Sequence, residues 1–273
     1  MSLKRFYIFT GKGGVGKTAL SLAFCSHLTE NKQNCLYIYF QNNKIQAKNT
    51  NTADKQLEQM AMDLGFKTLG LDLMACSQEY IANKLKSENI AKWIIKTPFF
   101  QSLVNMIPGL SYVIYMGKIL EMLVKDPTLT AVLDSPSSGH ALTMLESTQN
   151  FNSIFKDGII HEDTNLMLKE LQTQDFFKLN IIALPTLLAL HEAIELKTSI
   201  KNLANYDLEI FCNNCLNQFE QYELPDFLIN KIKNENKALE EFEHLAQQEV
   251  PYNMGETPLQ VIKELVPSME NLV

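Results

Sequence analysis

Short apolar runs alternate with longer stretches of helical periodicity along most of the chain. Four short and mostly apolar runs are predicted to be strands: residues 4–10, 35–40, 67–75 and 129–133. The second run leads into a polar stretch at residues 41–55, which is predicted to be an exposed loop. This alternation of strands and helical stretches favours an α/β fold.

Helical periodicity accounts for most of the remaining chain. The predicted helices cover residues 18–29, 57–64, 77–125 (as several helices), 151–177, 228–248 and 258–265. Residues 97–116 carry no charged side chain, and an uncharged run of this length could cross a membrane. Pro98, Pro108 and Gly109 interrupt the run, so we predict packed helices and no transmembrane segment.

The helices predicted at residues 77–125 are apolar on more than one face. They contain Met106, Met116 and Met122. Flexible methionines occur on surfaces that bind varied partners, so these helices are a candidate surface for a hydrophobic protein client. The alternative is that these methionines simply pack in the hydrophobic core, which is the more common role of such side chains.

Residues 9–18 (FTGKGGVGKT) carry the strongest chemical signal. They fit the phosphate-binding pattern G-x-x-x-x-G-K-[ST] between a predicted strand and a predicted helix. The glycines let backbone N–H groups face phosphate oxygens, and the helix N-terminus adds a positive dipole. Lys17 is expected to reach the β- and γ-phosphates, and the Thr18 hydroxyl to bind Mg²⁺. The predicted nucleotide-binding residues of the loop are Gly11, Gly13, Gly14, Val15, Gly16, Lys17, Thr18 and Ala19.

Two polar residues follow predicted strands. Asp134 ends the run at residues 129–133, and a carboxylate there, beside a P-loop, is expected to support Mg²⁺. Gly139 follows and can flex near the γ-phosphate. Gln41 follows the second strand and is expected to face the phosphates, because loops after strands line the ligand crevice of α/β sheets.

The net charge, the single arginine and the N-terminal sequence limit which ligands, which catalytic cation and which location are expected. The formal net charge is −7, which disfavours nonspecific binding to nucleic acid. Arg5 is the only arginine and begins the first predicted strand, so a cation that stabilises a transferring phosphoryl group must be a lysine. No signal peptide is recognisable before the first strand, and we expect a cytoplasmic protein with free thiols.

Cys212 and Cys215 have the C-x-x-C spacing of half a zinc site or of a redox pair. The chain has no second pair of this spacing, so a zinc site would need two chains. The two residues also overlap the end of a predicted strand. A structural role is the preferred interpretation, with metal binding and redox chemistry left open.

The P-loop contains a second lysine, Lys12. The sequence K-G-G-V-G-K-T resembles the deviant P-loop of the superfamily that includes MinD, ParA, the nitrogenase iron protein and ArsA. In that group the first lysine reaches the nucleotide of the partner subunit. The resemblance therefore implies a nucleotide-dependent dimer in which Lys12 acts across the interface, and a solvated loop lysine is the alternative.

A second resemblance is more specific. Residues 134–145 (DSPSSGHALTML) are similar to the Asp-Thr-Ala-Pro-Thr-Gly-His-Thr-Leu-Arg-Leu-Leu segment of the ArsA-like ATPases. That family includes bacterial arsenite-pump ATPases and targeting factors for tail-anchored membrane proteins. Supporting similarities lie at residues 108–110 with 117–123, 181–196, 208–213 and 250–256. The resemblance implies that Asn213 and Pro251 hold the adenine of ATP or ADP.

The chain departs from this family at informative positions. Gln41 stands where the family has an Asp that orients the attacking water. Glutamine can hydrogen-bond water but cannot act as a general base, so hydrolysis is expected to be slow or dependent on a partner. Thr143 replaces an arginine, and Cys76 is the only thiol near the helical region, so a three-thiol arsenite site in one chain is not expected.

We therefore predict one P-loop NTPase domain, residues 1–273, with a mostly parallel sheet flanked by helices. An α-helical subdomain is expected at residues 73–126, between the second and third core strands, joined by residues 150–178. The expected ligands are ATP or ADP and Mg²⁺, and the expected partner is a second copy or a paralogous ATPase. The predicted catalytic residues are Lys12, Lys17, Gln41 and Asp134. An arsenite- or anion-pump subunit and a weakly hydrolysing partner of an active paralogue are the alternatives.

Overall fold

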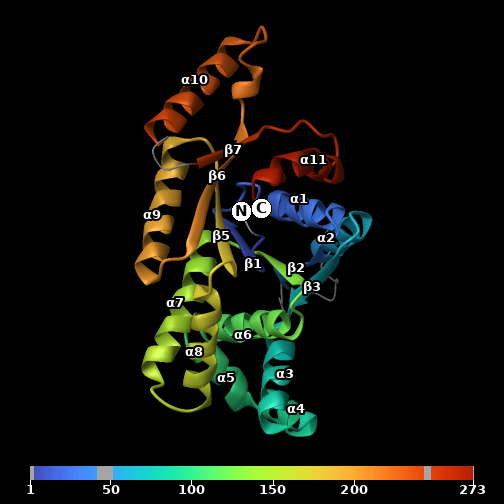
Figure 1. Ribbon diagram of the computed structural model, residues 1–273, viewed down its shortest axis with the longest axis vertical. Coiled ribbons are helices and arrows are strands. Elements are labelled where there is room, and N and C mark those ends of the chain that lie inside the picture. Colours follow the sequence, from blue (N-terminus) through green and yellow to red (C-terminus); the bar gives the residue numbers. More distant parts are fainter. Residues whose placement is uncertain (1–2, 42–51, 243–246, 273) are drawn as a thin grey trace.

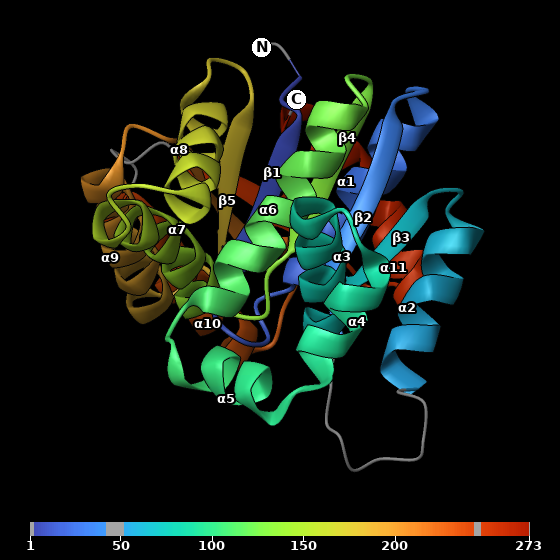
Figure 2. The same cartoon turned by 90° about the horizontal axis from the view of Figure 1, so that it is seen from below.

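The strands lie side by side in one sheet whose neighbouring pairs all run parallel (Figures 1 and 2). The computed structural model describes residues 3–41, 52–242 and 247–272. Within them the seven strands have the spatial order β3-β2-β4-β1-β5-β6-β7. Their bounds are β1 Phe6–Gly11, β2 Asn34–Phe40, β3 Lys67–Leu71, β4 Leu129–Asp134, β5 Phe177–Ala183, β6 Asp207–Cys215 and β7 Gln247–Pro251. The predicted α/β fold is thus confirmed, with a sheet that is parallel at every described pairing.

Helices cover both faces of this sheet. Many begin at Asp, Ser or Thr residues whose side chains accept a hydrogen bond from the first turn, as Thr186 does from Ala189. Proline occupies the first turn of two of them, where its missing N–H costs nothing. The helices are α1 Lys17–Glu30, α2 Thr52–Asp63, α3 Leu73–Leu85, α4 Glu88–Lys96, α5 Pro98–Met106, α6 Leu110–Lys125, α7 Ser138–Ile154, α8 Ile159–Gln172, α9 Leu187–Leu203, α10 Asp226–Glu241 and α11 Pro258–Leu265.

Two apolar cores form because the side chains of each strand alternate between the faces of the sheet. In β1, Phe6 and Ile8 belong to the core shared with α6, α7 and α9, whereas Tyr7 and Phe9 belong to the core shared with α1 and α11. Strands covered on both faces are apolar at nearly every position, which explains the continuous apolar runs in the sequence. The parallel arrangement also brings the C-terminal ends of all strands to one edge of the sheet.

Several predicted boundaries are wrong, including the end of the loop predicted at residues 41–55, because α2 already begins at Thr52. The strand predicted at residues 67–75 ends at Leu71, because the Asp72 side chain accepts a hydrogen bond from the N–H of Ala75 (2.7 Å) and starts α3. The helix predicted at residues 151–177 is two helices, and the second ends at Gln172 before β5. The helix predicted at residues 228–248 ends at Glu241, and β7 follows from Gln247.

Helices α3 to α6 lie between β3 and β4 in the chain, at the lower end of the molecule in Figure 1. Because β3 belongs to the sheet, they follow the third strand rather than the second. Helix α6 contacts both α7 and α8, and buried residues such as Met116 share one core with the sheet. The division of residues 73–126 into a separate subdomain stays a prediction.

The described helices differ from membrane-spanning helices in length and composition. No single one is both long and apolar enough to span a bilayer. Only α5 and α6 together reach that length and composition, and the two helices are bent by 97° at the break between them.

Gly109, at the start of α6, is predicted to tolerate no side chain. Its φ angle is +81°, and a Cβ built there would lie 2.0 Å from Ser147 Oγ of α7. Gly65, after α2, has a similar φ of +86°, and a Cβ there would lie 3.8 Å from Thr29 Cγ2, an ordinary contact distance. Gly65→Ala should cost about 1 kcal/mol of unfolding free energy for backbone strain alone. Gly109→Ala should cost about 3 kcal/mol, because overpacking is added.

Urea denaturation of the two alanine variants measures this difference directly. Equal losses of unfolding free energy in Gly109→Ala and Gly65→Ala would mean that α6 and α7 do not approach each other closely at Ser147.

Candidate functional site

The glycine-rich loop connects β1 to α1 at the C-terminal edge of the sheet. Gly11, Gly14 and Gly16 have φ angles of +146°, +80° and +95°, which side chains rarely adopt. A Cβ at Gly11 would lie 2.2 Å from the carbonyl oxygen of Ile182 in β5. The loop therefore rests directly on a neighbouring strand, and the sequence pattern of glycines has a steric cause.

Lys17 directs its ammonium group into this loop. Its Nζ donates a hydrogen bond to the carbonyl oxygen of Lys12 (2.7 Å), and only 8% of the residue is exposed. Burial lowers the pKa of Lys17, while the charge of Asp134 opposes this shift. No carboxylate among the described residues lies within ion-pair distance of Nζ. A buried cation with a single carbonyl acceptor, beside a helix N-terminus, suits an anionic ligand.

Asp134 lies at the end of β4, next to the loop. One carboxylate oxygen, Oδ2, accepts hydrogen bonds from Thr18 Oγ1 (2.6 Å) and from Tyr37 OH (2.9 Å). The other, Oδ1, is buried and has no hydrogen-bond partner among the described residues. Burial raises the pKa of Asp134, and the two hydroxyl donors and the charge of Lys17 oppose that shift.

These groups fit a magnesium ion. Mg²⁺ prefers hard oxygen ligands and is bound through one or two carboxylates together with phosphates and water. Thr18 and Asp134, the predicted metal-binding residues, supply such oxygens side by side, and the unpartnered Oδ1 is the atom that a cation or its water would satisfy. Mg²⁺ binding by these residues stays a prediction. Tyr37 is a site residue that the sequence did not reveal, although a tyrosine in the middle of a buried strand needs a partner for its hydroxyl.

Lys12 lies at the outer side of the loop. Its Nζ forms an ion pair with Glu192 Oε1 of α9, and 58% of its side chain is exposed. Glu192 belongs to the same chain and was not singled out from the sequence. The action of Lys12 across a dimer interface stays a prediction, and it requires this ion pair to open.

Gln41 leaves β2 on the side of β3. Its side chain lies so close to Gly70 that a Cβ there would meet Gln41 Cγ and Nε2 at 2.6 Å, and it hydrogen-bonds Tyr39. Strand β3 lies on the opposite side of β2 from β4, so the described contacts of Gln41 are not with Asp134. Its expected orientation toward the phosphates stays a prediction. Residues 42–51, which follow it in the predicted loop, lie outside the described residues.

The two predicted adenine-binding residues lie on adjacent strands. Asn213 of β6 is buried, and its Nδ2 donates to the carbonyl oxygen of Val15 (2.8 Å), so it supports the glycine loop. Its Oδ1 has no partner among the described residues. Pro251 ends β7 and lines a hollow of about 530 Å³ together with Phe219, Tyr222, Tyr252 and Met254. The contact of either residue with adenine stays a prediction.

Cys212 and Cys215 are both buried in β6 and are not joined by a disulfide. Cys215 Sγ donates a hydrogen bond to the carbonyl oxygen of Cys212 (3.2 Å), and burial raises the pKa of Cys212 to about 12. Such thiols are poor nucleophiles and poor metal ligands. In the described part of the chain, no three His, Cys, Asp or Glu side chains gather where they could hold a metal ion.

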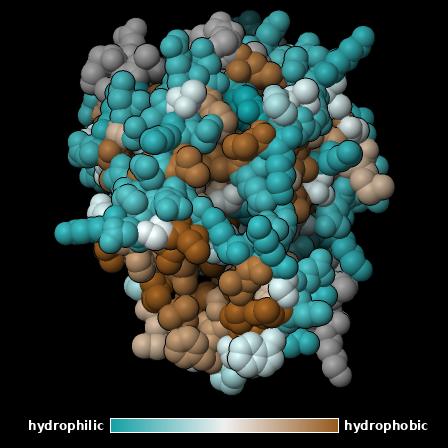
Figure 3. All heavy atoms as spheres, turned by 60° about the horizontal axis from the view of Figure 1, so that its bottom comes forward, coloured by the Kyte–Doolittle hydropathy of each residue, from teal (hydrophilic) through white to brown (hydrophobic). Residues whose placement is uncertain are grey.

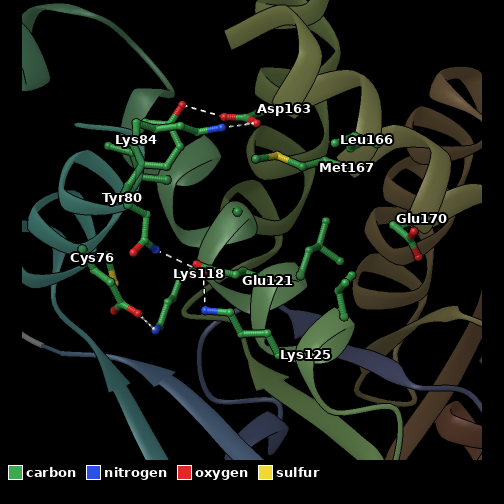
Figure 4. A pocket seen from close by; sticks show the side chains of 16 residues that line it. Cys76, Tyr80, Lys84, Lys118, Glu121, Lys125, Asp163, Leu166, Met167 and Glu170 are labelled. Carbon is green, nitrogen blue, oxygen red and sulfur yellow. Dashed lines mark hydrogen bonds and ion pairs between the residues drawn. The ribbon is translucent and has the colours of Figure 1, made fainter. Parts of the chain in front are cut away.

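A second hollow, of about 490 Å³, lies among α3, α6 and α8 (Figure 4). Apolar side chains such as Leu120, Leu166 and Met167 line it. Ion pairs surround it: Lys84 with Asp163, Lys118 with Glu79 and Lys125 with Glu121.

Apolar side chains are also exposed at the end of the molecule where α4 and α5 lie (Figure 3). Trp93, Phe99 and Met106 are 70%, 76% and 78% exposed, values that core residues do not show. Exposed apolar side chains therefore do lie in this region, whereas Met116 of the predicted surface is fully buried, and client binding there stays a prediction.

Comparison with known proteins agrees with this geometry. Residues 4–247 match the model of the anion-transporting ATPase family. The "ATPase ASNA1 homolog" of Cryptosporidium parvum is 29% identical over 157 residues, which is 56% of this chain and 40% of that protein. The "ATPase BagA" of Mycobacterium tuberculosis is 23% identical over 217 residues, which is 76% of this chain and 63% of that protein.

The chain thus spans less than two thirds of the length of these relatives. The family match, in contrast, covers nearly the whole chain, including the glycine loop, Asp134 and Asn213. The resemblance drawn from the P-loop and from residues 134–145 is confirmed: the chain belongs to the anion-transporting, ArsA-like ATPase family and has the α/β fold of a P-loop NTPase.

Proposed function

We propose that this chain is a magnesium-dependent ATPase that binds ATP in the loop from Gly11 to Thr18. The observation that carries the proposal is the buried ammonium of Lys17, held inside a glycine loop at the N-terminus of α1. Membership of an ATPase family supports ATP as the nucleotide and its hydrolysis as the reaction. A cytoplasmic location belongs to the same proposal.

Each residue of the site has a definite task in this proposal. The backbone N–H groups of the loop and the helix dipole hold the phosphates, and Lys17 neutralises their charge. Thr18 and Asp134 hold Mg²⁺, which when bound supplies positive charge at the β- and γ-phosphates. Asn213 keeps the loop in place through Val15. Adenine contacts at Asn213 Oδ1 and beside Pro251 complete the binding of ATP.

In this function, Lys12 of a partner chain supplies the cation that stabilises the transferring phosphoryl group. Arg5 cannot serve, because its guanidinium donates to the carbonyl oxygens of Leu123 and Asp126, at the opposite end of β4 from Asp134. Lys12 is exposed on the surface and can leave Glu192 when an interface forms. The active form is therefore a dimer, either of two copies or with a paralogous ATPase.

A hydrophobic protein client is the substrate class that the surface favours. The exposed Trp93, Phe99 and Met106 supply apolar area beyond what a monomer needs. His140, six residues after Asp134, contacts Tyr112 of α6, and Tyr112 also packs edge to face against Phe40 at the end of β2. Nucleotide binding near Asp134 can therefore shift the helices that carry this surface.

An anion-pump subunit is the weaker alternative. Soft thiolate ligands suit arsenic(III), but Cys76 is the only cysteine in α3 to α6 and is buried. Turnover stimulated by arsenite would favour the pump, whereas turnover altered by a peptide with a long apolar segment would favour client binding. Calorimetric titration with ATP, with and without Mg²⁺, tests the shared first step. Failure of ATP to bind would refute both functions.

Gln41→Asp tests the third possibility, a chain that binds ATP but hardly hydrolyses it. If the missing carboxylate limits the reaction, steady-state phosphate release should rise at least about tenfold, because a positioned general base contributes that much or more. Gln101→Asp, on the exposed face of α5, is the matched control and should leave turnover unchanged. An unchanged rate in Gln41→Asp would show that position 41 does not limit hydrolysis.

A further inference from the structure

The carboxylate of Asp134 is surrounded by hydroxyl groups from two other elements. Thr18 of α1 and Tyr37 of β2 both donate to Oδ2, at 2.6 and 2.9 Å. Ser21, one turn after Thr18 in α1, hydrogen-bonds the same Tyr37 phenol. The four side chains thus form a closed group in which Tyr37 connects the helix of the P-loop with the acid at the end of β4.

We propose that Tyr37 is a positioning residue of the magnesium site: its phenol holds Oδ2 of Asp134 so that Oδ1 stays free for the metal or its water. This inference rests on the proposed function and adds a residue to its site. Tyr37 does not bind the metal itself. It acts through Asp134.

The surroundings of Tyr37 suit this task better than those of Thr18. Thr18 is itself the expected metal ligand, so its hydrogen bond to Asp134 changes when Mg²⁺ binds. Tyr37 is fully buried in β2, which is hydrogen-bonded to both β3 and β4, and its ring packs near Phe66. Its hydrogen bond therefore keeps the Asp134 carboxylate in one orientation with and without metal.

The free oxygen supports the same conclusion. A buried carboxylate normally has each oxygen satisfied, yet both hydroxyl donors here converge on Oδ2 and leave Oδ1 without a partner among the described residues. An arrangement that only satisfied a buried aspartate would divide the donors between its oxygens. Because both hydroxyl groups donate to Oδ2, the carboxylate is held in one orientation, and Oδ1 is left as an acceptor that points in a fixed direction.

Tyr37→Phe tests the proposal, with Tyr80→Phe as the matched control. Tyr80 also donates its phenol proton to an aspartate, Asp163 Oδ2 at 2.7 Å, but in the helices α3 and α8. The measurement is calorimetric binding of ADP in EDTA and over a series of Mg²⁺ concentrations. Affinity in EDTA should stay within about twofold of wild type in both variants, and the half-saturating Mg²⁺ concentration should rise about tenfold in Tyr37→Phe alone.

The outcomes distinguish the role of Tyr37 from the proposed nucleotide binding itself. The same Mg²⁺ dependence in Tyr37→Phe and wild type would overturn the role of Tyr37 while leaving nucleotide binding intact. A wild-type protein that binds no nucleotide under any condition would instead remove the proposed function, and the inference with it.

A second measurement does not depend on how Tyr37→Phe folds. 3-Fluorotyrosine placed at position 37 keeps the phenol, and its fluorine resonance reports, through the hydrogen bond, on the charge of the Asp134 carboxylate, which Mg²⁺ changes without turning the carboxylate. The resonance should move when Mg²⁺ is added to the ADP-bound protein and stay in place when ADP is added in EDTA. The same label at position 80 should not respond to Mg²⁺, and an unresponsive label at position 37 would overturn the proposal.

Discussion

Lys17→Ala is expected to lower the affinity for ATP at least about a hundredfold, because it removes two or more charge-assisted hydrogen bonds to phosphate. The variant should fold normally. Burial lowers the pKa of Lys17, which means that the charged side chain costs folding free energy at neutral pH, and alanine removes that cost. Loss of this cost offsets the loss of the buried side-chain methylenes, so the unfolding temperature should stay close to that of wild type.

Calorimetric titration with ATP measures this effect. Lys169→Ala, on the exposed surface of α8, removes the same charge elsewhere and should bind ATP like wild type. Retention of wild-type affinity by Lys17→Ala would place the nucleotide outside the glycine loop and contradict the proposed site.

Lys12→Ala is expected to separate ATP binding from ATP cleavage. Affinity should change less than about threefold, whereas turnover should fall by about a thousandfold, the lower range measured for cations supplied in trans to phosphoryl transfer. Glu192→Gln is the complementary variant, since it keeps Lys12 and removes its ion-pair partner in the same chain. Its turnover should equal or exceed that of wild type.

Single-turnover and steady-state phosphate release distinguish these cases. Normal turnover in Lys12→Ala would remove the trans-acting role of this lysine. Equal losses in Lys12→Ala and Glu192→Gln would mean that the ion pair itself, and not its release, supports the reaction.

The parts of the fold that depend on local sequence could be predicted. The glycine loop was recognised because the pattern from Gly11 to Thr18 places glycine where positive φ angles and contact with β5 require it. The buried strands were recognised because both faces of the sheet are covered. Asp134 was recognised by its position at a strand end, and it does lie beside Thr18.

Contacts between distant segments could be predicted only where motifs mark both partners, as they do for Thr18 and Asp134, which are 116 residues apart. Lys12 and Glu192 are 180 residues apart in the chain, and Tyr37 and Asp134 are 97 residues apart. No local pattern marks such partners, because they depend on the order of strands in the sheet. The same limitation applies to Gln41: β2 lies between β3 and β4, and no local pattern shows that the Gln41 side chain leaves the sheet toward β3.

ATP bound in the Gly11–Thr18 loop is expected to join two chains into a dimer that hydrolyses it. Light scattering with simultaneous phosphate assay tests it most directly, on wild type and Lys17→Ala. With Mg²⁺ and ATP the wild-type mass should rise from 31.1 kDa to about twice that value as phosphate appears, and Lys17→Ala should do neither. A wild-type protein that stays at 31.1 kDa and releases no phosphate would contradict the account.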